Sequence, residues 1–149
     1  MSEIKTALMA DIKACMKSGD KDRLAVLRLV SAAVKQREVD DRVETDDPAM
    51  IAILDKMAKQ RRESIEQFNK GGRDDLAAVE QKELKIIQAY LPQQLSDDEI
   101  QTLIDTAVAE TGASEIRDMG KVMGKLKPQL QGRADMSAVS AKIKSKLGG

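Results

Sequence analysis

Apolar residues recur at helical spacing along this chain, and no stretch of useful length alternates in the way that a β-strand requires. Ile4, Leu8 and Ile12 follow one another at intervals of four, and Gly19 marks the end of that segment. Residues 24–34 are apolar nearly all round, which is typical of a helix buried by several neighbours. The pattern predicts an all-α protein. The expected helices span about 3–17, 21–43, 48–69, 74–91, 96–112, 117–127 and 136–147.

Capping signals divide these helices from one another. Asp46 or Asp47 precedes Pro48, an arrangement typical of a first helical turn. Ser96 and Glu99 have the spacing of a capping box, in which each side chain accepts a hydrogen bond from the other's backbone N–H. We therefore expect a firm helix start at Ser96, and we expect Asp135 to cap the last helix.

A change of organisation falls at Pro92. The residue before a proline disfavours helical geometry, so the fourth helix should end there, and residues 93–95 form a short linker. The sequence therefore predicts a four-helix N-terminal unit over residues 1–92. A small three-helix C-terminal domain is expected over residues 93–149.

The composition excludes several kinds of chemistry. The chain of 149 residues is 42% hydrophobic, but Phe68 and Tyr90 are its only aromatic residues, so the core must be aliphatic. With no histidine, there is no imidazole acid, base or metal ligand. Cys15 is the single cysteine and is expected to be a small core residue, not part of a zinc site. The paired acids at 40–41 and 46–47 fit helix ends, so we assign no catalytic residue, metal or cofactor.

The sequence also suggests a compartment. No apolar run approaches the roughly 20 residues that a membrane span needs. The N-terminal residues carry acids and lysines throughout and lack the apolar core of a signal peptide. We therefore expect a cytoplasmic protein that does not interact with membranes.

Charge is distributed unevenly, although the formal net charge is zero. Residues 93–116 hold six acids and no base, whereas residues 117–149 hold eight bases and two acids. This polarity is the first indication of function, because a positive segment suits an anionic partner. The lysines of the last helix are expected to form a solvated face; they are Lys142, Lys144 and Lys146.

The segment DMGKVMGKLKPQLQGRAD, residues 118–135, combines glycines with positive charge. Its GKVMGKL portion is not a phosphate-binding loop, because three residues instead of four separate the glycines and Leu126 stands where Ser or Thr is required. Gly120 and Gly124 are four apart and share one helix face. That face could pack against another helix, or it could admit a nucleic-acid backbone, with phosphate contacts from Lys121, Lys125, Lys127 and Arg133.

A second basic cluster, KQRRES at residues 59–64, is expected to lie on a solvent-exposed helix face, where its charges form ion pairs. Arg61 falls within an apolar stripe, so we expect it to reach a partner acid and not a ligand.

Several segments together resemble one known family. They are GDKDRLAVLRLV (19–30), KQRRESIEQF (59–68), GRDDLAAVEQKELKIIQAYLPQQL (72–95) and DMGKVMGKLKPQLQGRAD (118–135). They are similar to the YqeY family over nearly the whole chain. From about Leu95 the chain also resembles the tail domain of GatB, the tRNA-binding subunit of the glutamine-dependent tRNA amidotransferase. The resemblance implies a helical bundle followed by a GatB-tail-like domain that faces tRNA through Gly120, Lys121, Gly124, Lys125, Lys127 and Arg133.

The resemblance implies a tRNA-associated accessory protein. One alternative is an adapter that binds an aminoacyl-tRNA enzyme or an amidotransferase component. A second alternative is a carbon–nitrogen ligase with glutamine as the amide donor. The part of GatB that activates the tRNA-bound acid with ATP has no counterpart in this sequence, so we expect no amide transfer by the chain alone.

Overall fold

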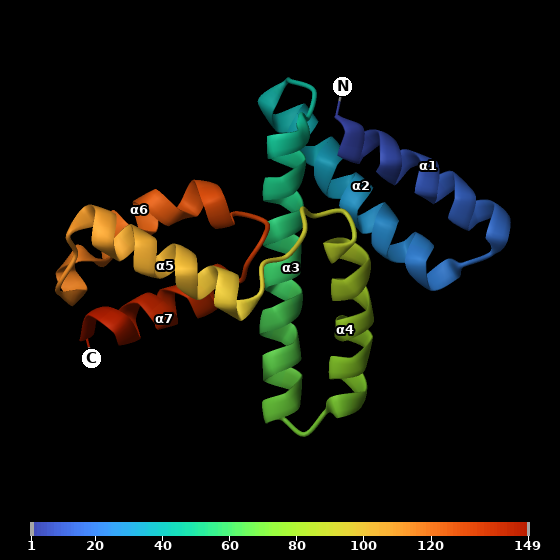
Figure 1. Ribbon diagram of the computed structural model, residues 1–149. Helices are drawn as coiled ribbons and strands as arrows, with labels where there is room; N and C mark the ends of the chain where they lie inside the picture. The colour runs from blue at the N-terminus through green and yellow to red at the C-terminus, as the bar shows by residue number, and fades with distance from the viewer. Residues whose placement is uncertain (1, 149) are drawn as a thin grey trace. The chain divides into compact units, whose positions relative to one another are not determined.

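The computed structural model describes residues 2–148, and every regular element in that range is a helix (Figure 1). The predicted all-α class is confirmed. The chain divides after Pro92 into two compact units, each with its own apolar core.

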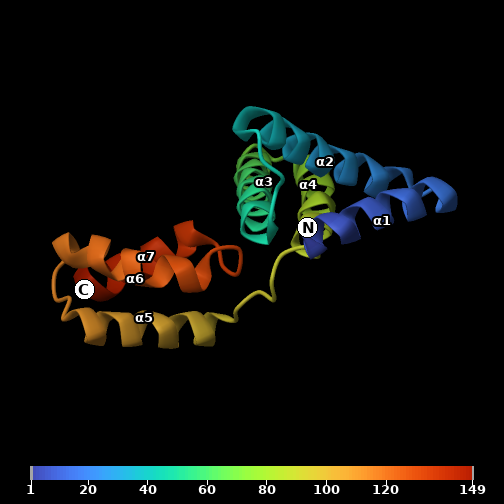
Figure 2. The ribbon, with the colours of Figure 1, turned by 90° about the horizontal axis from the view of Figure 1, so that it is seen from above.

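The N-terminal unit consists of two helical hairpins (Figures 1 and 2). Helix α1 (Glu3–Ser18) pairs with α2 (Lys21–Asp41), and α3 (Asp47–Lys70) pairs with α4 (Asp74–Gln88). The core between them is aliphatic, as expected, and contains Cys15. Its most deeply buried large side chains are Leu8, Leu27, Val30, Met50, Leu54 and Ile87.

The turns of this unit follow the capping signals. Gly19 ends α1 with a φ of 78°, in the left-handed region that glycine adopts without strain. Asp46 accepts a hydrogen bond from the Ala49 N–H at 3.0 Å and so caps α3, as predicted.

Helix α4 differs from expectation at two points. It ends at Gln88, earlier than predicted, although Leu91 beyond it is still buried. Val79, whose apolar side chain in the predicted fourth helix would suit the core, is 53% exposed. In that turn the position facing α3 belongs to Glu80, whose carboxylate meets Arg61. A polar contact between the helices has replaced the apolar one that the spacing suggested.

Arg61 joins the two helices of this hairpin. Its Nε lies 2.9 Å from a Glu83 carboxylate oxygen and 3.5 Å from one of Glu80, and its side chain is only 16% exposed. The expected pairing of Arg61 with an acid is confirmed. Burial, followed by the nearby Glu83 charge, raises the pKa of Glu80 above its usual value, and Arg61 opposes that rise.

Replacing Arg61 by methionine should leave two half-buried carboxylates side by side without a cation. We expect a loss of about 2 kcal/mol at pH 7, below the full cost of breaking a buried pair because solvent screens part of it. Because the pKa of Glu80, already raised by burial, rises further without Arg61, protonation of Glu80 removes the repulsion, and the loss should shrink as the pH falls toward 4. Urea unfolding at pH 7 and at pH 4 measures the free energy of unfolding that the variant loses relative to the wild type. Arg62→Met, next to it and in no ion pair within residues 2–148, is the control; an equal loss at both pH values would contradict the explanation.

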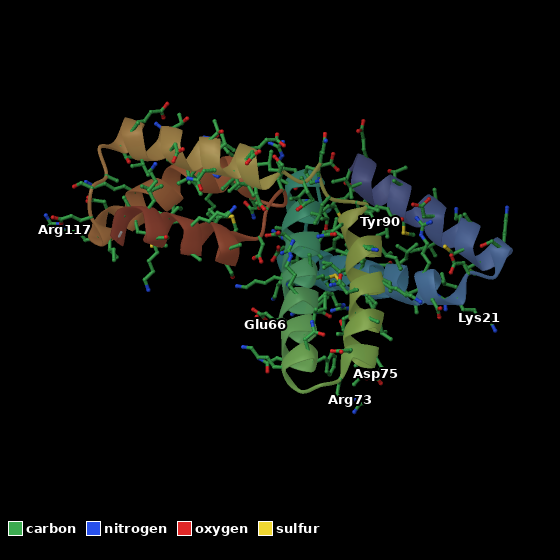
Figure 3. The ribbon with its side chains drawn as sticks, turned by 60° about the horizontal axis from the view of Figure 1, so that its bottom comes forward. Lys21, Glu66, Arg73, Asp75, Tyr90 and Arg117 are labelled. Atoms are coloured by element: carbon green, nitrogen blue, oxygen red, sulfur yellow. The ribbon has the colours of Figure 1, made fainter. Side chains whose placement is uncertain are left out.

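Tyr90 ties the end of α4 to the other hairpin (Figure 3). Its hydroxyl donates a hydrogen bond to the Asp11 carboxylate on α1. Arg23, near the start of α2, lies 3.5 Å from the Tyr90 hydroxyl and 3.6 Å from Asp11. Burial and the hydrogen bond to Asp11 together raise the pKa of Tyr90 to about 12.

Tyr90 is the only tyrosine, so ultraviolet titration reports this contact directly. We expect a midpoint near the value of about 12 in the folded protein. Since the unfolded phenol ionises near pH 10, the fold should lose stability as the pH rises between those two values. Asp11→Asn should lower the midpoint because the charged acceptor is lost. A midpoint near 10 in the folded wild type would show that the buried contact does not form.

The C-terminal unit contains α5 (Asp97–Thr111), the short 3-10 helix η1 (Ile116–Asp118), α6 (Met119–Leu130) and α7 (Met136–Gly148) (Figure 2). Its most deeply buried residues come from all three α-helices; they are Ile104, Val122, Leu126, Leu130, Val139 and Ile143. Both hydrogen bonds of the capping box at Ser96 and Glu99 are present, at 3.1 and 3.2 Å. Asp135 accepts from the Ser137 N–H at 3.1 Å at the start of α7.

Helix α6 continues through Pro128 to Leu130, whereas the sequence predicted that this helix ends at about residue 127. Proline in a helix interior removes the hydrogen bond to the carbonyl four residues earlier, here that of Gly124, at a cost of about 3 kcal/mol. Continuing the helix places Leu130 one turn beyond Leu126, and both are fully buried. Burying a leucine side chain stabilises by about 1.5–3 kcal/mol, which offsets most of the cost of the proline.

A candidate nucleic-acid interface on helix α6

The outer face of α6 carries two glycines on which no other part of the described structure packs. Gly120 and Gly124 are both exposed, and a Cβ atom built on either would meet no atom within 4 Å. Neither has a positive φ, so neither is required for a turn. The interpretation that these glycines pack against another helix is therefore wrong for the structure described by residues 2–148.

Lys127 extends this bare face. Gly120, Gly124 and Lys127 follow i, i+4, i+7 spacing and so lie on one side of α6, opposite the buried Val122 and Leu126. We call the surface formed by Gly120, Lys121, Gly124 and Lys127 the glycine–lysine face.

Two of its members offer positive charge. Neither Lys121 nor Lys127 forms an ion pair within residues 2–148. Lys121 lies close enough to Asp118 to contribute to the lowered pKa of that carboxyl, whose main cause is hydrogen bonding from the Ser114 and Glu115 N–H groups. The glycine–lysine face thus combines uncovered backbone with two cations free to meet an anion.

Lys125 is engaged within the unit. Its ammonium forms an ion pair with Glu110 of α5. Lys142 and Lys146 of α7 likewise pair with Asp97 and Asp105 of α5, the first at 3.2 Å. The Lys146 hydrogen bond is the first cause of the lowered pKa of Asp105.

These ion pairs correct the picture given by the charge count. The acidic and basic segments are consecutive in sequence, but helix packing sets α5 beside α6 and α7, so that much of their charge is mutually neutralised. Of the lysines expected to form a solvated face on the last helix, only Lys144 is both exposed and without an ion pair in the part of the chain that the structure describes. The positive charge available to a partner is therefore concentrated on fewer residues than the sequence suggested.

Arg133 is separate from the glycine–lysine face. It follows α6, and its Nε donates to the Gln93 carbonyl at 3.3 Å, beside the start of α5. There it lines a hollow of about 470 Å³ with residues of α5. Sequence reasoning missed this hollow, since only the capping box marked the start of α5. The structure thus groups Gly120, Lys121, Gly124 and Lys127, places Lys125 in an ion pair, and holds Arg133 elsewhere.

Within residues 2–148 no group of three or more His, Cys, Asp and Glu side chains is arranged to hold a metal ion. None of the helices there has the length and apolar character needed to cross a membrane.

Three fungal proteins illustrate the relatives of this chain, and each is named altered inheritance of mitochondria protein 41, mitochondrial. The one from Pyrenophora tritici-repentis is 31% identical over 144 residues, covering 95% of this chain and 79% of the relative. That from Eremothecium gossypii is 41% identical over 85 residues, or 56% of this chain and 46% of the relative. That from Vanderwaltozyma polyspora is 26% identical over 93% of this chain and 79% of the relative.

These names contradict the cytoplasmic location expected from the sequence, and that assignment is wrong. The expectation relied on the lack of a continuous apolar signal core. Segments that direct proteins to mitochondria are amphipathic and rich in arginine, so the lack of an apolar core says nothing about a mitochondrial location.

A family comparison covers almost the whole chain. The model described as Yqey-like protein matches residues 5–147, which include all the helices of both units almost to their ends. The resemblance noted in the sequence is thereby confirmed, and this chain belongs to the YqeY-like protein family.

Proposed function

We propose that this protein is a tRNA-associated accessory protein that binds the tRNA backbone through the glycine–lysine face of α6. The observation that carries the proposal is the pair of exposed glycines in the middle of a helix. Each costs about 1 kcal/mol relative to alanine. Neither supports a turn or a packed contact within the described residues, so the cost is explained if another molecule approaches the helix backbone at this face.

The neighbouring charges indicate the kind of molecule. Lys121 and Lys127 flank the bare backbone and suit phosphate groups, while Gly120 and Gly124 let a sugar–phosphate chain come closer than any side chain would. The likeness of this region to the tail of GatB supports tRNA as the nucleic acid. Both aromatic residues lie in the N-terminal unit, so the C-terminal unit cannot stack bases on aromatic rings, and binding should depend on RNA shape and phosphate charge.

A gel-shift titration tests the proposal. The full chain is titrated into tRNA and into duplex DNA of similar length at two salt concentrations. We expect a preference for tRNA and a steep loss of affinity at the higher salt. Absence of a tRNA complex even at low salt would refute the proposal.

The double variant Lys121→Ala, Lys127→Ala should bind tRNA more weakly and with a flatter salt dependence. If each lysine contacts one phosphate, the slope of log K against log salt should fall by about 2. Lys13→Ala, Lys17→Ala on α1 is the matched control, because it removes the same charge from exposed lysines of the N-terminal unit that form no ion pair within residues 2–148. If both double variants lost affinity equally, binding would depend on overall charge and not on α6.

A second candidate function is favoured by a different surface. A hollow of about 520 Å³ lies between α2 and α3, where the half-buried residues Ala33, Ala52 and Ile53 present apolar surface between charged rims. Such a hollow suits a protein partner, for instance an aminoacyl-tRNA enzyme or an amidotransferase component. Ile53→Asp should then abolish capture of that partner while leaving the tRNA gel shift unchanged.

A further inference from the structure

The hollow beside Arg133 is lined only by residues of the C-terminal unit. They belong to the start of α5 and to the segments before α5 and after α6, whose ribbons can be followed in Figure 2. The hollow's volume of about 470 Å³ falls within the range of small-molecule sites. The residues that line it are Leu95, Asp98, Glu99, Thr102, Leu103 and Arg133.

Backbone hydrogen bonds fix the walls of this hollow. The Leu95 N–H donates to the Arg133 carbonyl at 2.9 Å, and the Gln94 side-chain amide donates to the Gly132 carbonyl at 2.7 Å. Gly132 is buried and has a φ of 77°, which a residue with a side chain would adopt only under strain. The segment before α5 is thereby tied to the segment after α6, and Arg133 is held over the first turn of α5.

The lining groups differ in chemistry from one wall to the next. Leu95 and Leu103 are half-buried and give an apolar surface. Arg133 uses Nε to bind the Gln93 carbonyl, which leaves its terminal nitrogens to donate to another acceptor. The Asp98 carbonyl accepts a hydrogen bond from the Thr102 hydroxyl at 3.0 Å, but the Asp98 carboxylate has no hydrogen bond or ion pair within residues 2–148 and is open to a donor. The Glu99 carboxylate already accepts a hydrogen bond from the Ser96 N–H in the capping box, and the positive charge of Arg133 contributes to lowering the pKa of Glu99.

A flat ligand with acceptors on one edge and donors on the other matches this arrangement. Guanine presents its O6 and N7 acceptors side by side, which is the pair that an arginine fork binds best. Its N1–H and N2–H groups are two adjacent donors that a carboxylate accepts together. No other RNA base offers two adjacent acceptors and two adjacent donors at once, and the aliphatic pair of leucines can cover the face of a base without an aromatic ring.

We propose that the hollow receives an unpaired guanine of the RNA whose backbone lies on α6. This inference rests on the proposed function and adds base selectivity to it. Arg133 binds the O6 and N7 edge, Asp98 binds the N1 and N2 edge, and the two leucines contact the ring. Arg133 is thus a base-contacting residue, where the sequence indicated a phosphate contact.

Fluorescence anisotropy of the full chain with labelled RNA hairpins tests the inference. The hairpins share one stem and a loop of uridines in which one position is kept or replaced by guanine, adenine or cytosine. The guanine loop should bind about tenfold more tightly than the others, the discrimination expected of one good bidentate contact. Asp98→Asn and Arg133→Lys should each remove most of this preference. Arg133→Lys keeps the charge but loses the planar fork, so the affinity for the all-uridine loop should stay within about twofold.

The controls separate this inference from the proposal on which it rests. Lys121→Ala should weaken all four hairpins by one common factor and leave the guanine preference intact. Circular dichroism confirms that each variant is folded. Equal affinity for the four loops, or a guanine preference that survives both Asp98→Asn and Arg133→Lys, overturns the inference and leaves backbone binding standing. Failure of every hairpin to bind overturns the proposed function and this inference together.

Discussion

The double variant Gly120→Ala, Gly124→Ala is expected to fold more stably than the wild type and to bind tRNA less well. Both glycines lie within α6, have no positive φ and have open space where a methyl group would go. Each alanine should therefore add about 1 kcal/mol of stability through its higher helix propensity. If RNA backbone approaches this face, the same two methyl groups stand where it must lie, and overpacking a close contact costs about 1–3 kcal/mol.

Opposite changes in stability and affinity are informative because most substitutions that weaken binding also weaken the fold. Urea unfolding gives the stability, and a tRNA titration at fixed salt gives a dissociation constant that should rise by at least about fivefold. Thr106→Ala is the matched control. It lies exposed on α5 and also gains helix propensity, so it should add stability without changing tRNA affinity. A stabilised glycine variant with unchanged affinity would show that nothing approaches α6 closely.

Local signals in the sequence were sufficient for most of the fold. The capping box at Ser96, the cap at Asp46 and the stop at Gly19 depend on residues within a few positions of one another, and all three are formed as expected. The errors arose where a distant residue decided the outcome. Val79 is exposed because Glu80 meets Arg61 of another helix, and α6 passes Pro128 because Leu130 is buried by its neighbours.

The candidate site was less predictable for the same reason. Sequence spacing placed Gly120 and Gly124 on one face, but only the packing of the unit shows whether a neighbour covers that face. The charge count treated Lys125 and Lys127 alike, whereas Glu110 of α5 engages the first and leaves the second free. Arg133 looked like one more phosphate contact until its tie to Gln93 placed it over a hollow. In each case the partner comes from another element of the fold.

Leu126→Ala should have the largest effect on stability of the changes considered for α6. Leu126 is fully buried between helices of the C-terminal unit, and truncating such a leucine typically costs about 2–5 kcal/mol through lost burial and the cavity left behind. A small unit has little stability to lose, since its core is limited by its size. We therefore expect the C-terminal unit to be largely unfolded in this variant and tRNA binding to be lost, although Leu126 itself cannot touch RNA.

Because each unit has its own core, the N-terminal unit should remain folded in Leu126→Ala. Tyr90 absorbance follows that unit alone, while amide hydrogen exchange follows each helix of both units. Leu54→Ala is the matched control, an identical truncation of a fully buried leucine in α3, and it should destabilise the unfolding transition seen by Tyr90 but spare tRNA binding. If Leu126→Ala shifted the unfolding transition seen by Tyr90 as strongly as Leu54→Ala does, the two units would unfold as one. A loss of tRNA binding in Leu126→Ala would then not assign the tRNA-binding surface to α6.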